Sequence, residues 1–172
     1  MSIALHWYAL KIFYNRSASI LAKLANEGLE HFAPTEVIRS LLFVRCDERR
    51  VMLLGEEHRG EVWVYRSLDN RRVPAVISDH EMEVFRFVVT AGRQGLTLLG
   101  DDRPEYHEGD RVVVTGGPFK GAEGHIKRIK KDRRLVVTVK GIVAVATTYI
   151  HPSLLRKIDE KEEEKTIGWG RV

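Results

Sequence analysis

The sequence predicts an α+β protein with two domains, a mixed sandwich of helices and antiparallel strands followed by a small β-barrel. Strand-like and helix-like segments alternate as far as Gly92, whereas only short strand-like segments follow His107. Eight of the fourteen glycines lie between Gly92 and Gly124, and the start of this stretch has few periodic apolar residues. We therefore expect domains at 1–92 and 107–158, a linker at 93–106 and a charged tail at 159–172.

The first domain opens with a strand and a helix. Aromatic and branched residues from Leu5 to Phe13 predict the strand. Asn15 is a suitable N-cap for the helix, and Gly28 is a suitable stop. The apolar stripe of that helix is expected at Ala18, Leu21, Ala22 and Ala25. Two strands and a short helix then follow, at Leu29–Ala33, Ser40–Cys46 and Glu48–Leu54.

Two further strands and a well-marked helix complete this domain. The strands are expected at Val62–Arg66 and Val73–Ile77. Ser78, with Glu81 three residues later, forms a capping box, and Gly92 ends the helix. Its apolar face consists of Met82, Phe85, Val88 and Val89. We expect all three helices to pack on one face of an antiparallel sheet.

The second domain reads as short strands separated by glycine-rich or charged turns, a pattern typical of a small barrel. The strands are expected around Val112 and Val114 and at Ile126–Ile129, Leu135–Val139, Ile142–Ala146 and Tyr149–Ile150. A cluster of basic residues, Lys130–Arg134, falls at a hairpin tip, where such charges serve either solubility or contact with a partner. The β-branched residues of 135–146 favour strands over helices.

Composition excludes several classes of protein. Of the 172 residues, 44% are hydrophobic and 30% are charged, which suits packed cores and argues against wholesale disorder. No apolar run approaches the ~18 residues of a membrane span. The sequence from Met1 to Leu5 lacks the features of a signal peptide. Because Cys46 is the single cysteine, no internal disulfide is possible, and we expect a cytoplasmic protein.

The net charge of +4 is unevenly distributed along the chain. Between Gly109 and Lys140 nine basic residues face three acidic ones, a net charge of +6, so the remainder carries −2. The predicted barrel therefore holds the excess positive charge, which permits contact with nucleic acid.

A glycine-rich loop joins two predicted strands within EGDRVVVTGGPFKGAEGHI, residues 108–126. Its glycines are expected to form turns or to adopt positive φ, namely Gly109, Gly116, Gly117, Gly121 and Gly124. Phe119 is expected at the loop tip, where it either plugs the end of the barrel or faces a partner. The segment closely resembles a KOW motif, the strand–loop–strand signature of SH3-like barrels.

Four segments of the N-terminal half carry a second resemblance. They are HWYAL at 6–10, LEHFAP at 29–34, LLFV at 41–44 and VWVY at 62–65. Together with the KOW motif, their order is similar to that of NusG-like transcription elongation and antitermination factors, nearest to specialised paralogues of the RfaH and UpxY type. The resemblance covers about residues 5–158 and implies a NusG-type sandwich of one antiparallel sheet and three helices. Only residues 35–40 stand where the family has a longer insert with a basic hairpin.

The resemblance implies a non-enzymatic function. In this family the N-terminal domain docks on the clamp helices of RNA polymerase and suppresses pausing or termination. Such docking needs exposed apolar side chains on one sheet face. The matching candidates are Tyr8, Leu10, Phe43, Trp63 and Tyr65. Each is alternatively an ordinary core residue, although Trp63 and Tyr65 point to the same face because strand residues alternate.

Contacts with nucleic acid and with further partners are also implied. Non-template DNA passes close to the N-terminal domain in this family, so candidate phosphate contacts are Arg16, Lys23, Asn26, His58 and Arg59. For Arg16 and Lys23 a solvated helix face explains the pattern equally well. The KOW domain would recruit Rho, a small-subunit ribosomal protein or RNA, with candidate contacts at Phe119, Lys120, Ile126 and Ile129.

Catalytic motifs are absent from the sequence. The seven histidines have no metal-ligand spacing, and no orienting motif surrounds Cys46. The glycine-rich loop lacks the Gly-Lys-Ser/Thr ending of a phosphate loop. We expect a monomer that is not an enzyme and that needs no cofactor or metal. The alternative function is that of a KOW-containing ribosomal or ribosome-associated RNA-binding protein, against which the opening Trp7-Tyr8 argues.

Overall fold

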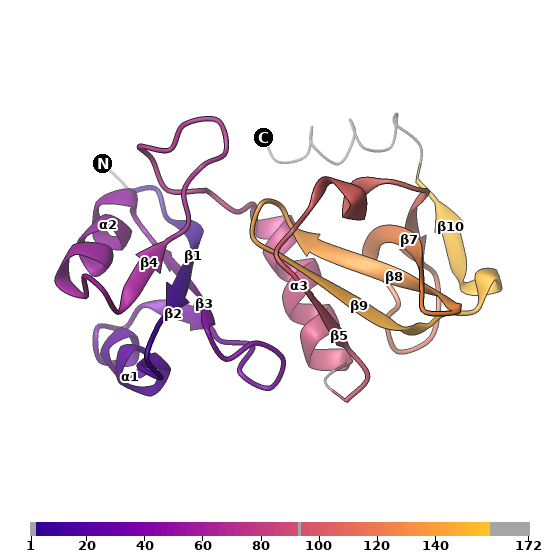
Figure 1. Ribbon diagram of the computed structural model, residues 1–172, viewed down its shortest axis with the longest axis horizontal. Coiled ribbons are helices and arrows are strands. Elements are labelled where there is room, and N and C mark those ends of the chain that lie inside the picture. Colours follow the sequence, from indigo (N-terminus) through magenta and orange to yellow (C-terminus); the bar gives the residue numbers. More distant parts are fainter. Residues whose placement is uncertain (1–2, 93, 159–172) are drawn as a thin grey trace.

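The computed structural model of the chain describes residues 3–92 and 94–158, which contain two antiparallel sheets (Figure 1). The first sheet has the order β2-β3-β1-β4 and consists of β1 (His6–Ile12), β2 (Glu30–Phe32), β3 (Leu41–Cys46) and β4 (Val62–Val64). The second has the order β10-β6-β7-β8-β9-β5 and consists of β5 (Thr97–Gly100), β6 (Arg111–Val114), β7 (Glu123–Ile129), β8 (Asp132–Val139), β9 (Val143–Tyr149) and β10 (Leu155–Lys157). With the helices, these sheets confirm the predicted α+β class.

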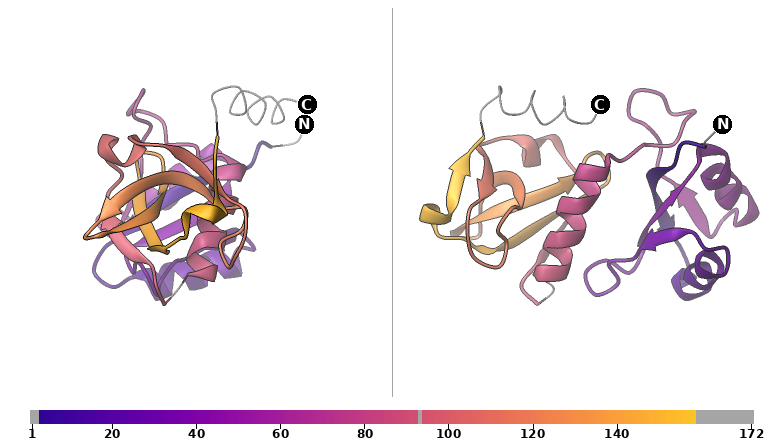
Figure 2. Two further views of the ribbon diagram at one scale, coloured as in Figure 1. Left: turned by 90° about the vertical axis from the view of Figure 1, so that its right-hand side faces the viewer. Right: turned by 180° about the vertical axis from the view of Figure 1, so that it is seen from behind.

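The helices cover both faces of the first sheet. α1 (Ser17–Asn26) and α2 (Glu48–Glu57) lie on one face, and α3 (Asp79–Ala91) lies on the other (Figure 2). Alternation along β1 explains this arrangement, because Tyr8 and Leu10 pack with α1 and α2 while Trp7 and Ala9 belong to the cluster that contains α3. The expectation that all helices share one face is therefore wrong for α3. The successive apolar residues of β1 require cover on both sides.

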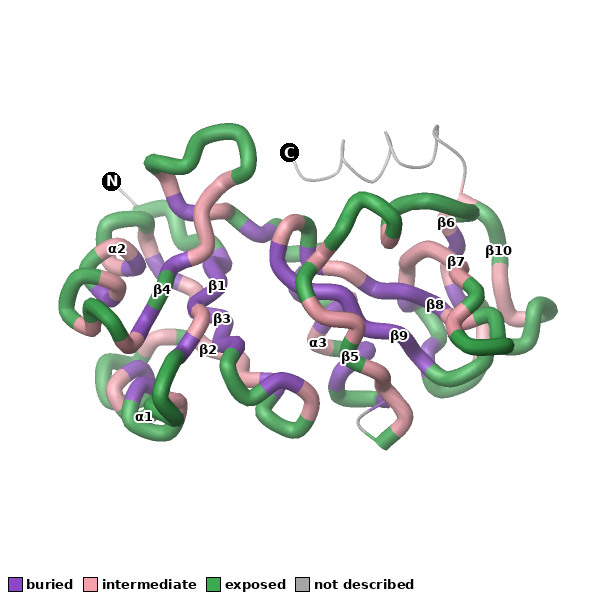
Figure 3. Tube along the Cα trace, in the orientation of Figure 1, coloured by how far each residue is buried: buried purple, intermediate pink, exposed green. Residues whose placement is uncertain are grey.

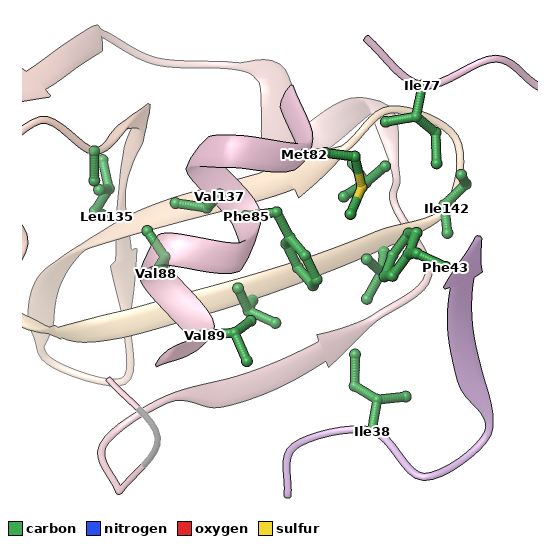
Figure 4. Packing of buried hydrophobic residues seen from close by; sticks show 14 of the residues in the cluster. Ile38, Phe43, Ile77, Met82, Phe85, Val88, Val89, Leu135, Val137 and Ile142 are labelled. Carbon is green, nitrogen blue, oxygen red and sulfur yellow. The ribbon is translucent and has the colours of Figure 1, made fainter. Parts of the chain in front are cut away.

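α3 lies between the two sheets and packs against both. The Phe85 ring meets the Phe43 ring of β3 edge-to-face, with centroids 5.5 Å apart. On the side of the second sheet, Val88 lies near Leu135 and Val137 of β8 (Figure 4). One continuous hydrophobic cluster thus runs from the first sheet through the helix into the second sheet. Buried residues occur in both sheets and in α3 (Figure 3).

The ends of α3 form as the sequence predicts, whereas the start of α1 does not. The Ser78 hydroxyl oxygen accepts a hydrogen bond from the Glu81 backbone N–H at 3.2 Å, and Gly92 is the C-cap. α1 begins after Arg16 without a side-chain cap, so the prediction for Asn15 is wrong. The buried residues of α1 are Ile20 and Leu24 rather than the expected stripe, in which Leu21 is half-buried and Ala18, Ala22 and Ala25 are exposed. The larger side chains fill the space against the sheet.

Four predicted segments differ in the structure, and one strand was not predicted. Residues 73–77 form no strand and make only isolated bridges, Arg66 to Pro74 and Trp7 to Ile77. The described part of the expected linker contains β5, which pairs with β9, and the 3-10 helix Pro104–His107. The strands expected at 142–146 and 149–150 are one strand, β9, and β10 was not predicted. Long-range pairing, which local patterns do not encode, accounts for these differences. The expected tail, 159–172, lies outside the described residues.

The part of the chain that the structure describes contains no helix long and apolar enough to span a membrane.

Cys46 gives a direct test of this packing. Its side chain at the end of β3 is 1% exposed, and burial, with a smaller contribution from Asp47, raises the pKa of the thiol to about 12. Because the thiolate is the reactive form, we expect Ellman's reagent at pH 8 to leave the native protein unlabelled. In urea one thiol per chain should react at the rate of glutathione, the control. Rapid labelling of the native chain would contradict the buried position.

Candidate functional site

An exposed aromatic pair lies on β4 and the residue that follows it. Val62 and Val64 are buried toward α2, so Trp63 and Tyr65 point to the opposite side of the strand. Their ring centroids are 4.7 Å apart with an interplanar angle of 67°. Trp63 is 43% exposed, and Tyr65 is half-buried. Burial and the Asp101 carboxylate raise the pKa of Tyr65. Tyr65 therefore supports a tryptophan that presents its surface to solvent.

The other three residues predicted to dock on a partner are not available on the surface. Tyr8 is 1% exposed, and Leu10 and Phe43 have no exposed surface. Tyr8 and Leu10 pack beneath α1 and α2, and Phe43 packs beneath α3. In this structure they are core residues, which corrects our expectation that they line the docking face. The core alternative holds because both faces of the sheet are covered.

Two further apolar side chains are exposed on the connection that follows β4. Leu68 is 62% exposed and Val76 is 58% exposed. The backbone N–H of Ala75 donates to the carbonyl oxygen of Tyr65 at 2.9 Å, which holds this connection beside the aromatic pair. The sequence analysis missed both residues, although apolar side chains in a segment rich in polar residues were a signal for them.

The residues predicted to contact DNA are on the surface, but some are engaged in ion pairs. Arg16 Nε lies 3.4 Å from a carboxylate oxygen of Glu61, which holds α1 near the turn before β4. Lys23 Nζ lies 2.8 Å from a carboxylate oxygen of Glu57, and this hydrogen bond is the main cause that lowers the pKa of Glu57. Both cations are thus partly neutralised by ion pairs within the protein, which is consistent with the alternative of a solvated helix face.

The remaining three DNA candidates differ in their exposure. Asn26 and Arg59 are exposed, and His58 is half-buried. The carbonyl oxygen of His58 accepts hydrogen bonds from the backbone N–H groups of Glu61 and Val62, both at 2.9 Å. His58 therefore shapes the turn before β4. Arg59 is exposed in the same turn, where its side chain can reach a phosphate group.

Phe119 closes one end of the second sheet. It is 9% exposed, and a Cβ placed on Gly92 would lie 2.9 Å from its ring. Leu96 packs against the same cluster. Of the two roles expected for Phe119, the structure matches the plug, because the end of α3 covers the ring. Lys120 beside it is exposed.

Ile126 and Ile129 of β7 are half-buried and contribute mainly to packing. Ile126 packs against the cluster that contains α3. Ile129 packs against a smaller cluster on the other side of the sheet, formed by Val136, Ala144 and Ala146. Neither forms an exposed contact surface of the kind that the sequence suggested.

The five loop glycines serve two different purposes. Gly109, Gly117 and Gly121 have positive φ, as expected. Gly116 does not have positive φ, and it lies close to Leu154, where a larger side chain would be crowded. Gly124 lies within β7 instead of a turn. Glycine is needed at this position because a Cβ would overlap the Val136 carbonyl oxygen of the neighbouring strand.

A cavity of about 850 Å³ lies between the start of α3 and strands β6 to β8. His80 Nε2 lies 3.1 Å from a Glu123 carboxylate oxygen, to which Arg111 Nη2 also lies within 3.5 Å. Desolvation by burial raises the pKa of Glu81, which accepts a hydrogen bond from the Lys140 backbone N–H at 2.5 Å. The contacts of His80 with Glu123 and of Glu81 with the Lys140 backbone link the start of α3 to the second sheet. Among the described residues no group of three or more His, Cys, Asp or Glu side chains is placed to hold a metal ion.

The hairpin between β7 and β8 carries a cluster of exposed basic residues. Lys130 and Lys131 form its tip, and Arg128 and Arg133 face each other across the two strands. All four residues are exposed. Such a projection attracts phosphates or acidic side chains at a distance.

Comparison with known proteins identifies one segment of the chain. Residues 108–140 match the KOW motif family. The match begins just before β6 and ends just after β8, so it includes the glycine loop, Phe119 and the basic hairpin. A search of curated proteins finds no match to the chain. The C-terminal part is therefore a KOW-containing, strand-rich region, joined to an N-terminal α+β sheet.

Proposed function

We propose that this chain is a transcription elongation or antitermination factor of the NusG-like type. Its first sheet would bind the clamp helices of RNA polymerase and so suppress pausing or termination. The observation that carries the proposal is the combination, in one chain, of a KOW motif with an N-terminal antiparallel sheet that presents the Trp63–Tyr65 pair. The resemblance of the four N-terminal segments supports the same function.

The docking mechanism follows from the geometry of the pair. A helix that packs on an exposed aromatic side chain removes its apolar surface from water, and tryptophan is a frequent anchor of such interfaces. Trp63 offers that surface, and the neighbouring Tyr65 ring packs against the indole ring and supports it. Arg59, at the exposed turn before β4, would add a phosphate contact to DNA. The protein would act as a cytoplasmic monomer without a cofactor, a metal or a catalytic group.

The KOW region would recruit the second partner through charge. Phe119 is covered by the end of α3, whereas Lys120 and the basic residues of the hairpin are exposed. They suit RNA or an acidic surface on Rho or on a small-subunit ribosomal protein. The same hairpin favours the alternative function, a ribosome-associated RNA-binding protein, because exposed lysines and arginines bind RNA phosphates directly.

Substitution of Trp63 tests the docking proposal. Loss of an interface tryptophan typically costs about 2 kcal/mol, so we expect Trp63→Ala to weaken binding to core RNA polymerase roughly thirtyfold. Leu53→Ala is the matched control, because Leu53 is 37% exposed on α2, on the opposite face. Binding is measured by pulldown and by titration with labelled polymerase, and thermal melting checks that both variants fold.

Polymerase that lacks its clamp helices provides the deciding comparison. The proposal requires wild-type protein to lose binding to this polymerase. Binding that survives the deletion, or equal affinity of wild type and Trp63→Ala, contradicts it. Co-sedimentation with ribosomes in the absence of polymerase binding would establish the alternative function instead.

A further inference from the structure

A two-residue turn of lysines joins β7 to β8. Ile129 pairs with Asp132 across the strands, so Lys130 and Lys131 alone form the loop. Lys130 has a φ of 60°, whereas Lys131 does not have positive φ. A hairpin loop of this kind normally selects glycine at its first position, because a Cβ crowds the backbone in the left-handed region. Lysine is therefore an unfavourable choice for the turn alone, and its charge is the feature to explain.

The charges of this hairpin are not neutralised within the described part of the chain. Its exposed basic residues are Arg128, Lys130, Lys131 and Arg133. None of these four side chains forms an ion pair or a hydrogen bond with another described residue. A carboxylate oxygen of Asp132 instead lies 3.8 Å from Arg134 Nη2. Four neighbouring cations without an internal partner attract an anionic one.

The chain that follows β10 has the complementary composition. Residues 159–165, which we call the acidic segment, contain five acidic residues and two lysines, a net charge of −3. Three of the acidic residues, Glu162–Glu164, are consecutive. A run of like charges adjacent to a folded domain is commonly an interaction tail. The sequence thus holds a covalently attached partner of opposite charge for the hairpin.

The acidic segment begins two strands away from β7, the strand that leads to the hairpin. The backbone N–H of Ile158 donates to the carbonyl oxygen of Arg111 at 2.9 Å. Arg111 of β6 pairs in turn with His125 of β7, and β7 continues from His125 to the turn at Lys130. Strand pairing therefore fixes where the segment starts relative to the hairpin.

The hairpin is within reach of the acidic segment. Neighbouring strands lie about 4.8 Å apart and a strand advances about 3.4 Å per residue, so the path from Ile158 across to His125 and along β7 to Lys130 is about 27 Å. An extended chain from Ile158 to Glu164 spans about 20 Å. The side chains of a lysine and a glutamate cover the remaining distance.

We propose that the acidic segment binds to the basic hairpin of its own chain. Glu162–Glu164 form ion pairs there with the four exposed basic residues. Each exposed pair is weak, so several pairs act together and the contact is reversible. A partner with more closely spaced negative charges displaces the segment, whereas weaker polyanions are kept off the hairpin. The contact involves neither Trp63 nor Tyr65, so it is independent of polymerase docking.

Spin-label NMR tests the contact in the full chain. The label is attached to Glu163→Cys, and the native Cys46, being buried, stays unlabelled. We expect the amide signals of residues 128–133 to broaden at low salt and to recover at about 0.5 M sodium chloride, which screens exposed charges. The same label on Asn26→Cys, exposed at the end of α1, is the control and should leave these signals sharp.

A mixed sample distinguishes contact within one chain from contact between two copies. It contains isotope-labelled chains without a spin label and spin-labelled chains without isotope. The proposal requires the hairpin signals to stay sharp in this mixture. Broadening that appears only between chains would instead show that the segment joins two copies, and the proposed contact within one chain would be wrong.

Fluorescence anisotropy with a labelled oligoglutamate peptide measures access to the hairpin. Glu162→Gln with Glu163→Gln and Glu164→Gln should bind the peptide about fivefold more tightly than wild type, the combined effect of several weak surface pairs. Adding Lys130→Gln and Lys131→Gln to both proteins should abolish this difference.

A second triple variant is the matched control for charge. Glu56→Gln, Asp69→Asn and Glu83→Gln remove the same charge from exposed positions outside the hairpin. This variant should bind the peptide much as wild type does. An equal gain in both triple variants would show that net charge, and not the acidic segment, controls access.

Three further results would overturn the proposal. They are hairpin signals that stay sharp at low salt, equal peptide affinity of wild type and the Glu162–Glu164 variant, and no binding of the peptide by any variant. The assays contain no polymerase, so such a failure is distinct from a failure of Trp63→Ala to weaken docking.

Discussion

Gly124→Ala should destabilise the chain more than any other single methyl group added to the KOW motif. The new Cβ would overlap the Val136 carbonyl oxygen across the β7–β8 pairing and would also press on Leu135. Backbone on the neighbouring strand has no rotamer with which to move away, so the two central strands must separate. We expect a loss of about 3 kcal/mol in the free energy of unfolding, the upper end of overpacking costs. Urea denaturation followed by circular dichroism measures it.

Gly116→Ala is the matched control for this prediction. Gly116 lies in the same motif and lacks positive φ, and its Cβ would meet only the end of the Leu154 side chain, at 3.2 Å. A flexible leucine can give way, so the expected cost is about 1 kcal/mol or less. If the two variants lost equal stability, the close approach of β8 to Gly124 would not be the cause.

Phe85→Ala should unfold both halves of the molecule together. Phe85 of α3 has no exposed surface, and its ring contacts Phe43 of β3 while the same helix packs on β8. Truncation of a buried phenylalanine costs about 3–5 kcal/mol, a large share of the typical 5–15 kcal/mol of a folded protein. At this chain length we expect the melting temperature to fall by roughly 10 °C or more.

Hydrogen exchange distinguishes a shared helix from a local defect. Amides of β1 and of β8 should lose protection to a similar extent in Phe85→Ala, because the hydrophobic cluster is continuous through α3. Phe87→Ala is the control, since Phe87 lies on the same helix but is 41% exposed. Full protection of β8 in Phe85→Ala would show that the second sheet does not depend on the helix.

Local patterns were sufficient to predict several elements. Aromatic and branched residues located β1, and the side chain of Ser78 with Gly92 fixed the ends of α3. Spacing of glycines in residues 108–126 was specific enough to identify the KOW motif. In these cases the residues that determine the element lie within or next to it.

Other features depend on distant parts of the chain and could not be predicted. Leu98 pairs with Val145 in β5 and β9, so a glycine-rich segment that resembles a linker becomes a strand. Whether Phe43 and Phe119 face solvent depends on α3, which covers both. Trp63 is 43% exposed because no element among the described residues buries it, and the alternation of Val62 to Tyr65 alone could not predict this.

The lengths of the strands at the borders of the two sheets bear on how the protein behaves when it is concentrated. β2, β4 and β10 have three residues each and β5 has four, and these strands end the two sheets, whereas the longer strands are all flanked on both sides. An unpaired backbone edge is a template on which a second copy can extend a sheet. Short borders give such growth little hydrogen-bonding length. Within the described residues, the fold thus limits self-association through its backbone and leaves recognition to side chains.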